Sequence, residues 1–290
     1  MFKGALSAII TPFRDGAIDE PALRDLIEWQ IQNGVDGIVP CGSTGESATL
    51  SHPEHEQVIK ITVEQVRKRV PVVAGTGSNS TAEAIRLTSF AREAGADGAL
   101  LVSPYYNKPT QDGIIRHYRA IAQSVALPLI VYNIPGRTGS SVLPETLAQL
   151  ADVPNIVGVK EASGSMDQAS DIRRLCGERL TVLSGDDSLT LPLIALGAKG
   201  AISVITNVMP RETHELTQAA LEGNFARARE LHYKMLPLMR ALFLETNPIP
   251  VKYAVSLMGK CTAELRMPLT TMSPGPAEKL RGVMKELRLI

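Results

Sequence analysis

The stretch Ile156-Val157-Gly158-Val159-Lys160-Glu161-Ala162-Ser163 decides how the rest of this chain is interpreted. It begins with a short apolar run, which is typical of a parallel strand covered on both faces, and the run leads directly into a lysine. An unpaired ammonium group is costly to bury, so a lysine is best tolerated at the end of such a strand, beside a cavity. Desolvation there lowers the pKa of the amine and frees it to attack a carbonyl group. By itself, the stretch favours the simpler interpretation of a strand-end lysine that reaches solvent.

The composition indicates a chain that can bury a sizeable core. It has 290 residues, of which 44% are hydrophobic, and its 30 Lys and Arg balance its 30 Asp and Glu. A net charge of zero gives no reason to expect a nucleic acid or an anionic membrane as a partner. The sequence shows no signal peptide and no apolar stretch long enough to span a membrane. Its three cysteines, Cys41, Cys176 and Cys261, lie far apart, so we expect a cytoplasmic protein without disulfides.

Short apolar runs alternate with amphipathic segments over the first two thirds of the chain. Each run has the length of a buried strand rather than of a helix. The eight runs are Ala5 to Ile10, Gly37 to Pro40, Val70 to Ala74, Gly98 to Val102, Pro128 to Tyr132, Ile156 to Val159, Leu180 to Leu183 and Gly200 to Val204. This alternation predicts an α/β fold, a (β/α)8 TIM barrel, which needs about 200 to 250 residues. An open doubly wound sheet is the alternative, but it would carry a glycine-rich fingerprint after its first strand.

Helix boundaries are visible between the runs. Asp19 precedes one apolar helical pattern, while Ser51 with Glu54 and Ser80 with Glu83 have the spacing of capping boxes. Glycines close several of these segments, where a left-handed residue ends a helix. These glycines are Gly34, Gly95 and Gly197.

After about Asn207 the remaining segments are all predicted to be helical, and we assign the last barrel helix to this region. The expected division is a barrel over residues 1–224 and a small C-terminal helical domain over residues 225–290. Thr246 to Pro250 is expected to separate two helices of this small domain.

In a parallel barrel, chemistry takes place at the carboxyl ends of the strands. The polar residues that follow the predicted strands include Ser43, Thr44, Tyr105, Tyr106, Tyr132, Arg137, Lys160, Asp186, Asp187 and Ser203. We predict no metal site, because His52-Pro53-Glu54-His55 lacks the zinc-protease spacing. We expect no cofactor either, because the glycine-rich loops lack the lysine of a nucleotide-binding loop; Gly42 to Gly45 could offer backbone N–H groups to a small anion.

A lysine, tyrosines and an arginine at one rim suggest carbonyl chemistry. The lysine would form an imine with a 2-oxo acid, and the imine would let the adjacent methyl group lose a proton. A tyrosine would move protons, and an arginine would bind a carboxylate with its planar guanidinium group. Each residue also has a simpler interpretation: packing for the tyrosines, a salt bridge for Arg137, helix caps for Asp186 and Asp187, and a structural role for the second candidate lysine, Lys252.

Four motifs carry a family resemblance. They are Gly42-Ser43-Thr44-Gly45-Glu46, Pro104-Tyr105-Tyr106-Asn107-Lys108-Pro109, Tyr132-Asn133-Ile134-Pro135-Gly136-Arg137-Thr138 and Gly158-Val159-Lys160-Glu161-Ala162. With them the chain resembles the pyruvate-dependent class I aldolase superfamily and, within it, the 4-hydroxy-tetrahydrodipicolinate synthase (dihydrodipicolinate synthase) family. The resemblance covers essentially the whole chain.

The resemblance implies condensation of pyruvate with L-aspartate 4-semialdehyde, the committed step of diaminopimelate and lysine synthesis, by a homotetramer built as a dimer of dimers. Lys160 would carry the Schiff base, and Tyr132 would transfer protons. Ser43 would link Tyr132 to Tyr106, which is expected to come from the neighbouring subunit. The substrate-binding residues implied by the resemblance are Thr44, Arg137, Gly185 and Ile202. In place of the usual two threonines the chain has Ser43-Thr44, and a serine keeps the hydroxyl but loses the methyl group that restricts its rotamer.

The resemblance also implies a site for L-lysine as a feedback inhibitor. The residues that match it are Ser47, Ala48, His52, His55, Asn79, Glu83 and Tyr105. Glu83 can pair with an ammonium group, while Asn79 and Tyr105 can bind a carboxylate. The simpler interpretation makes Glu83 a capping residue and the two histidines surface residues of a first helical turn.

Two alternative functions remain at this point. A sister enzyme, an N-acetylneuraminate lyase or a 2-keto-3-deoxy sugar-acid aldolase, would share the lysine and the tyrosine, although Arg137 and the tyrosine pair favour the synthase. A non-catalytic barrel that binds a metabolite is the more distant alternative, and the presence of both Lys160 and Tyr132 argues against it.

Overall fold

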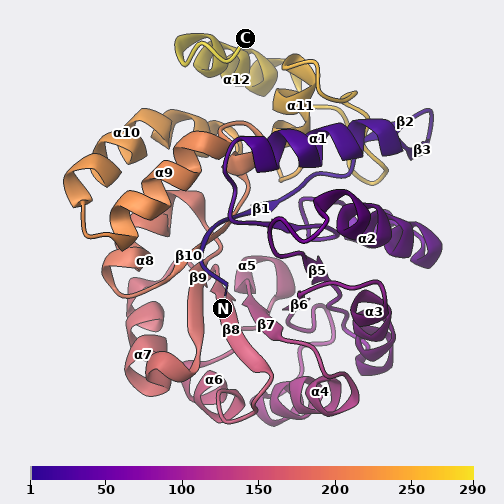
Figure 1. Ribbon diagram of the computed structural model, residues 1–290, viewed down its shortest axis with the longest axis vertical. Coiled ribbons are helices and arrows are strands. Elements are labelled where there is room, and N and C mark those ends of the chain that lie inside the picture. Colours follow the sequence, from indigo (N-terminus) through magenta and orange to yellow (C-terminus); the bar gives the residue numbers. More distant parts are fainter. Residues whose placement is uncertain (1) are drawn as a thin grey trace.

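The structure of the chain, a computed structural model, describes residues 2–290 and contains the predicted barrel (Figure 1). Eight parallel strands form one sheet in the order β4-β1-β10-β9-β8-β7-β6-β5. A parallel bridge between Ile38 and Val72 joins the two edges of that sheet and closes it. The strands are β1 (Gly4–Ala8), β4 (Gly37–Val39), β5 (Val73–Gly75), β6 (Gly98–Val102), β7 (Leu129–Asn133), β8 (Ile156–Glu161), β9 (Thr181–Ser184) and β10 (Gly200–Ser203).

Helices surround the barrel and extend beyond it at the C-terminus (Figure 1). They are α1 (Glu20–Gln32), α2 (His52–Val66), α3 (Thr81–Glu93), α4 (Gln111–Ser124), α5 (Pro135–Thr138), α6 (Pro144–Leu150), α7 (Met166–Cys176), α8 (Thr190–Ala195), α9 (Pro210–Leu221), α10 (Phe225–Ala241), α11 (Ile249–Leu257) and α12 (Pro274–Glu286). Short 3₁₀ turns are η1 (Ser47–Thr49), η2 (Gly177–Arg179), η3 (Asp187–Leu189) and η4 (Ile205–Asn207). A small hairpin of β2 (Phe13–Arg14) and β3 (Ala17–Ile18), which the sequence analysis did not predict, follows β1.

Alternation along the strands separates an inner core from an outer one, because successive side chains of a strand point to opposite faces. The inner core fills the barrel and includes Leu6, Val39, Leu100, Ile130, Tyr132, Leu183 and Ile202. Outward side chains such as Val131 and Val159 pack against the surrounding helices. The barrel is therefore a packed core, and a site can form only at its end.

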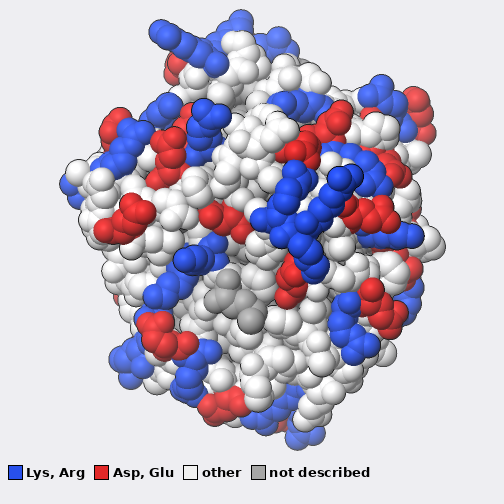
Figure 2. Space-filling view, viewed as in Figure 1, with Lys and Arg blue, Asp and Glu red and all other residues white. Residues whose placement is uncertain are grey.

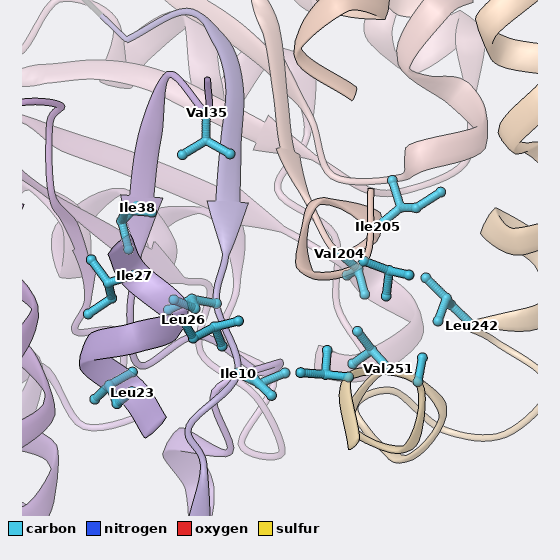
Figure 3. Close-up of a cluster of buried hydrophobic side chains, with 14 of the residues drawn as sticks. Ile10, Leu23, Leu26, Ile27, Val35, Ile38, Val204, Ile205, Leu242 and Val251 are labelled. Atoms are coloured by element: carbon cyan, nitrogen blue, oxygen red, sulfur yellow. The ribbon is translucent and has the colours of Figure 1, made fainter. Parts of the chain in front are cut away.

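The C-terminal helices share a core with the barrel. Figure 3 shows Ile10 between Leu26 of α1 and Val251 of α11, and Leu242, which follows α10, joins the same cluster. In the view of Figure 1, α11 and α12 lie above α1. This shared burial anchors the segment 225–290 to the N-terminal part of the barrel; the division of the chain after residue 224 stays a prediction.

Most of the predicted boundaries agree with the structure. All eight predicted strands are present, and Asp19 and Ser51 cap their helices, the latter with a complete capping box. Gly34, Gly95 and Gly197 have the expected left-handed backbone. The predicted capping box at Ser80 is wrong: Ser80 accepts the N–H of Glu83, but the Glu83 carboxylate is bonded to Ser78 and His52 instead.

The surface carries both signs of charge. On the face drawn in Figure 2, Lys and Arg are interspersed with Asp and Glu. None of the helices between residues 2 and 290 combines the length and the apolar character that spanning a membrane requires. The three cysteines are free thiols.

Candidate active site

A bulge in β8 aims Lys160 into the barrel. Leu129 of β7 pairs with Ile156, but Ile130 pairs with Gly158, so β8 has one extra residue, Val157. In a regular strand, one extra residue would turn every side chain after it to the opposite face. The bulge absorbs Val157, so Lys160 pairs with Tyr132 and both side chains face the interior. The strand extends to Glu161, so Lys160 lies within the strand and not after it, as the apolar run had suggested.

Lys160 is buried rather than solvated, which contradicts the simpler interpretation of its stretch. Only 5% of its surface is exposed, and its Nζ lies 4.3 Å from the centroid of the Tyr132 ring. Burial lowers the pKa of Lys160 to about 8; the charge of Asp187 opposes this shift, and Arg137 adds to it. About a tenth of the lysine is therefore the neutral, nucleophilic amine at pH 7, far more than of a lysine with the ordinary pKa.

Gly185 leaves the space that the lysine side chain occupies. A Cβ atom at position 185 would lie 3.0 Å from Lys160 Cε and 2.6 Å from Ala162 Cβ. The backbone of Gly185 is held in place, because its N–H donates to the Glu161 carbonyl at 2.7 Å. Ile202 of β10 is buried in the same interior and pairs with Leu6 of β1.

Tyr132 remains protonated next to the lysine. Burial raises the pKa of Tyr132 to about 12, opposed by the charge of Arg137 and by a hydrogen bond with Ser43. A protonated phenol that is bonded to a hydroxyl can donate a proton and recover it through that hydroxyl. Ser43 thus lies near Tyr132 in the same chain, and the proton-transfer link between them stays a prediction.

Thr44, Arg137 and Asn247 meet beside this pair. The Asn247 side-chain amide donates to Thr44 Oγ1 at 3.0 Å, which leaves the Thr44 hydroxyl proton free to be donated to an anion. Arg137 donates to the Asn247 carbonyl at 3.0 Å. The sequence analysis treated Asn247 only as part of a break between helices, because a residue 203 positions from Thr44 gives no local signal of this contact.

The loop that carries Ser43 and Thr44 is held by a buried ion pair. Lys252 of α11 is fully buried and paired with the Glu46 carboxylate, whose other oxygen accepts the Arg266 N–H at 3.0 Å. Lys252 therefore has the structural role that was predicted. These contacts hold Glu46 in a left-handed conformation, with φ 54°. The Gly45 N–H donates within the loop, to the Gly42 carbonyl at 3.0 Å, so it is not among the N–H groups that this loop could offer to an anion; anion binding by the rest of the loop stays a prediction.

The two aspartates after β9 have different roles. Asp186 caps η3, as predicted, and accepts the Ser188 N–H at 2.9 Å. Asp187 is buried and instead accepts the N–H groups of Val204 and Ile205, at 3.1 and 2.9 Å. It holds the end of β10 and contributes a negative charge near Lys160, so the interpretation of Asp187 as an ordinary cap is wrong.

A cavity of about 440 Å³ opens beside these residues. Ser43, Arg137, Thr138 and Asn247 line one part of it. Six residues of the predicted inhibitor site also line it, and they are Ser47, Ala48, His52, His55, Glu83 and Tyr105. Asn79 is placed differently: its side-chain amide donates to the Tyr105 carbonyl at 3.1 Å. Ser43 and Arg137 thus share one cavity with the predicted inhibitor site, whereas Lys160 and Tyr132 are not among the residues that line it. In this cavity Glu83 already bonds His52 Nε2 at 2.7 Å.

Tyr106 points away from this site in its own chain. It is 89% exposed, and its backbone has a left-handed φ of 72°, which is uncommon for a bulky residue and costs free energy. A large exposed aromatic ring held in such a conformation is typical of an interface.

The arrangement can form and use an imine. It combines a buried amine, a protonated phenol with a hydroxyl relay, and a guanidinium group at the mouth of the cavity. Among residues 2–290, no group of three or more His, Cys, Asp and Glu side chains is placed to hold a metal ion.

Fold and site together define a class, that of barrel enzymes with a buried lysine inside the barrel. The chain belongs to the dihydrodipicolinate synthetase family, whose model matches residues 1–287. It is 62% identical, over the full length of both chains, to the 4-hydroxy-tetrahydrodipicolinate synthase of Syntrophus aciditrophicus. It is therefore an enzyme, a lyase.

Solved structures agree with this assignment. The dihydrodipicolinate synthase of Aquifex aeolicus is 54% identical and superposes with a TM-score of 0.98, with 99% of each chain covered. A synthase of Cyanidioschyzon merolae with lysine bound is 40% identical, with a TM-score of 0.97 over 100% of this chain and 99% of that one. A monomeric synthase variant is 44% identical, with a TM-score of 0.98 over 100% of this chain and 98% of that one.

Deletion of Val157 tests the role of the bulge. Without this residue β8 can pair with β7 as a regular strand, so Lys160 should still face Tyr132 and keep its covalent pyruvate adduct after borohydride reduction, measured by mass spectrometry. One alanine inserted between Val159 and Lys160 should instead turn Lys160 to the outer face and abolish the adduct. An adduct at Lys160 in the insertion variant, folded by circular dichroism, would show that the register of β8 does not aim the lysine.

Proposed function

We propose that this enzyme condenses pyruvate with L-aspartate 4-semialdehyde to give 4-hydroxy-tetrahydrodipicolinate, the committed step of diaminopimelate and lysine synthesis in the cytoplasm. The observation that carries the proposal is the pairing of Lys160 with Tyr132 inside the barrel. The relatives named 4-hydroxy-tetrahydrodipicolinate synthase support the choice of reaction.

In the first half of the reaction, the neutral Lys160 amine attacks the keto carbon of pyruvate. Loss of water leaves an imine, and its positive charge lets the adjacent methyl group lose a proton to give an enamine. Tyr132 moves protons through Ser43, and Tyr106 of a neighbouring subunit would connect this relay to solvent. Thr44 has a free hydroxyl proton for the pyruvate carboxylate.

In the second half, the enamine carbon attacks the aldehyde carbon, and the new alkoxide takes up a proton from Tyr132. Arg137 binds the carboxylate of the aldehyde substrate in bidentate fashion. The amino group of that substrate then attacks the imine carbon, which closes the ring and releases the Lys160 amine. Gly185 and Ile202 shape the pocket: Gly185 gives room to the lysine, and Ile202 is an apolar wall of the interior.

A sugar-acid lyase or aldolase is the weaker alternative. Such an enzyme would share Lys160 and Tyr132 but must accommodate a polyhydroxylated chain at the mouth. Here the mouth contains Arg137 tied to Asn247, which suits a short anionic aldehyde. Turnover of pyruvate with aspartate semialdehyde, compared with N-acetylmannosamine or glyceraldehyde, separates these functions.

Trapping with borohydride in the presence of pyruvate tests the nucleophile. We expect one reduced pyruvyl adduct per chain, mapped to the peptide that contains Lys160, because Lys160 is the lysine whose burial lowers its pKa to about 8 beside a tyrosine. Lys160→Ala should abolish the adduct and lower kcat by at least about a thousandfold while the fold persists. Lys252→Met is the comparison, and an adduct at Lys252 would contradict the assignment.

We further propose that L-lysine inhibits the enzyme from the part of the cavity around Glu83. The carboxylate of Glu83 can pair with the lysine side-chain ammonium, with His52 and Ser78 as its present partners. Burial lowers the pKa of His55, whose Nε2 lies 2.8 Å from the Gly75 carbonyl, so its ring is a neutral donor that ties α2 to the end of β5. The lysine-bound algal relative supports this ligand.

L-lysine should therefore raise the melting temperature and slow turnover. At a hundred times its Kd, a ligand stabilises the folded state by about 2.7 kcal/mol, which corresponds to a shift of several degrees. Glu83→Gln should reduce both effects at least tenfold in apparent affinity, whereas Glu215→Gln, a change on the distant helix α9, should leave them intact. An unchanged melting temperature and rate in the wild-type enzyme would remove the proposal of inhibition.

We propose a homotetramer, built from two tight dimers in which each chain lends Tyr106 to its partner. The exposure and left-handed backbone of Tyr106 support this interface. The monomeric synthase variant shows that family membership does not by itself decide the assembly.

Mixing of two defective variants tests the shared site. Lys160→Ala and Tyr106→Ala should each be nearly inactive alone. After co-assembly, activity should return to about a quarter of the wild-type value, because half of the random dimers are hybrids with one complete site in two. The control mixes Lys160→Ala with the double variant, which supplies no intact site; recovery there, or none in the first mixture, would exclude an exchanged Tyr106.

A further inference from the structure

Asn247 has one polar atom that no group in residues 2–290 satisfies. Its side chain is 95% buried, with 5% of the residue exposed, and it lines the cavity. The amide nitrogen donates to Thr44 Oγ1, and the backbone carbonyl accepts from Arg137, each at 3.0 Å. The amide oxygen, Oδ1, is buried without a hydrogen-bond partner.

A buried acceptor without a donor costs free energy, because the atom has lost its water and gained nothing in return. Such an atom in a residue that lines a cavity is a candidate for a ligand contact. Since it is an oxygen, the ligand must present an N–H or O–H group. Since Arg137 donates to the carbonyl of the same residue, the oxygen lies close to a guanidinium group that can bind a carboxylate.

A carboxylate next to an N–H donor is the pattern of an α-amino acid. We propose that Asn247 Oδ1 accepts a hydrogen bond from the α-amino group of the aldehyde substrate while Arg137 binds its carboxylate. Asn247 is then a specificity-determining residue that selects an amino-acid aldehyde over the same aldehyde without the amino group. This inference rests on the proposed function, in which the same amino group later attacks the imine carbon.

The contact also fits the timing of the reaction. An amide oxygen accepts from an ammonium group and from a neutral amine alike. Asn247 can therefore bind the substrate amino group both as the ammonium ion and as the neutral amine, whose lone pair is free to attack the imine carbon. Because the amide nitrogen of Asn247 donates to Thr44 Oγ1, the amide group cannot rotate without breaking that bond.

Two substrates separate this role from a structural one. L-aspartate 4-semialdehyde carries the amino group, and succinic semialdehyde lacks it. In Asn247→Ala and in Asn247→Ser, we expect kcat/KM for the amino-acid aldehyde to fall about 10–100-fold, while carbon–carbon bond formation with succinic semialdehyde changes less than about threefold. Damage to Thr44 or Arg137 would instead slow both substrates, because both have a carboxylate and use the same enamine.

Thr44→Ser is the matched control. It keeps the hydroxyl that accepts from the Asn247 amide nitrogen and so leaves Oδ1 in place; any effect should fall on both substrates alike and preserve their ratio. If either folded Asn247 variant keeps the wild-type ratio, the inference is overturned. If wild-type enzyme forms no pyruvate adduct at Lys160 or does not turn over the amino-acid aldehyde, the proposed function itself has failed, which is a separate outcome.

Discussion

The pairing of Tyr132 with Lys160 across β7 and β8 is the contact on which the rest of the site depends. Lys160 faces the barrel interior, as Tyr132 does, because the bulge in β8 absorbs the extra residue Val157. A lysine turned outward from β8 would meet the apolar helices that cover Val159. Turned inward, it lies over an aromatic ring, with Asp187 and Arg137 near enough to affect its pKa. Burial and neighbouring charges then set the reactivity of the amine.

The C-terminal helices belong to this site as much as the barrel does. Helix α11 supplies Lys252 to the loop of Glu46, and the segment before it supplies Asn247 to Thr44 and Arg137. A buried ion pair is weak evidence for stability but specifies a geometry, since breaking it would leave an uncompensated charge. We infer that these contacts position the hydroxyl groups of Ser43 and Thr44. The same cavity reaches Glu83, so a ligand bound there would lie close to the loop that carries Ser43.

Local patterns predicted the elements well and their contacts less well. The apolar runs identified all eight barrel strands, and Asp19, Ser51 and the glycines at 34, 95 and 197 marked helix ends, because these signals involve residues close in sequence. The capping box predicted for Ser80 and Glu83 was wrong because the Glu83 carboxylate bonds Ser78 and His52 instead of the Ser80 backbone. Asp187 was misread because its partners, Val204 and Ile205, lie on another strand end.

The sequence by itself determined the class of fold and the end of the barrel, at the carboxyl ends of the strands, where the site lies. Through its family motifs it also determined the residues of the proposed site. Those properties follow from residue types at short spacing and from their order along the chain. Only the tertiary structure decided that Lys160 is buried within a strand, that a bulge keeps it facing inward, and that Asn247, which lines the cavity, has a buried oxygen without a hydrogen-bond partner. Register and burial arise from contacts between segments far apart in the chain, for which no local pattern encodes the partner. The stretch that begins at Ile156 therefore specifies a reactive lysine only in the context of its neighbouring strand.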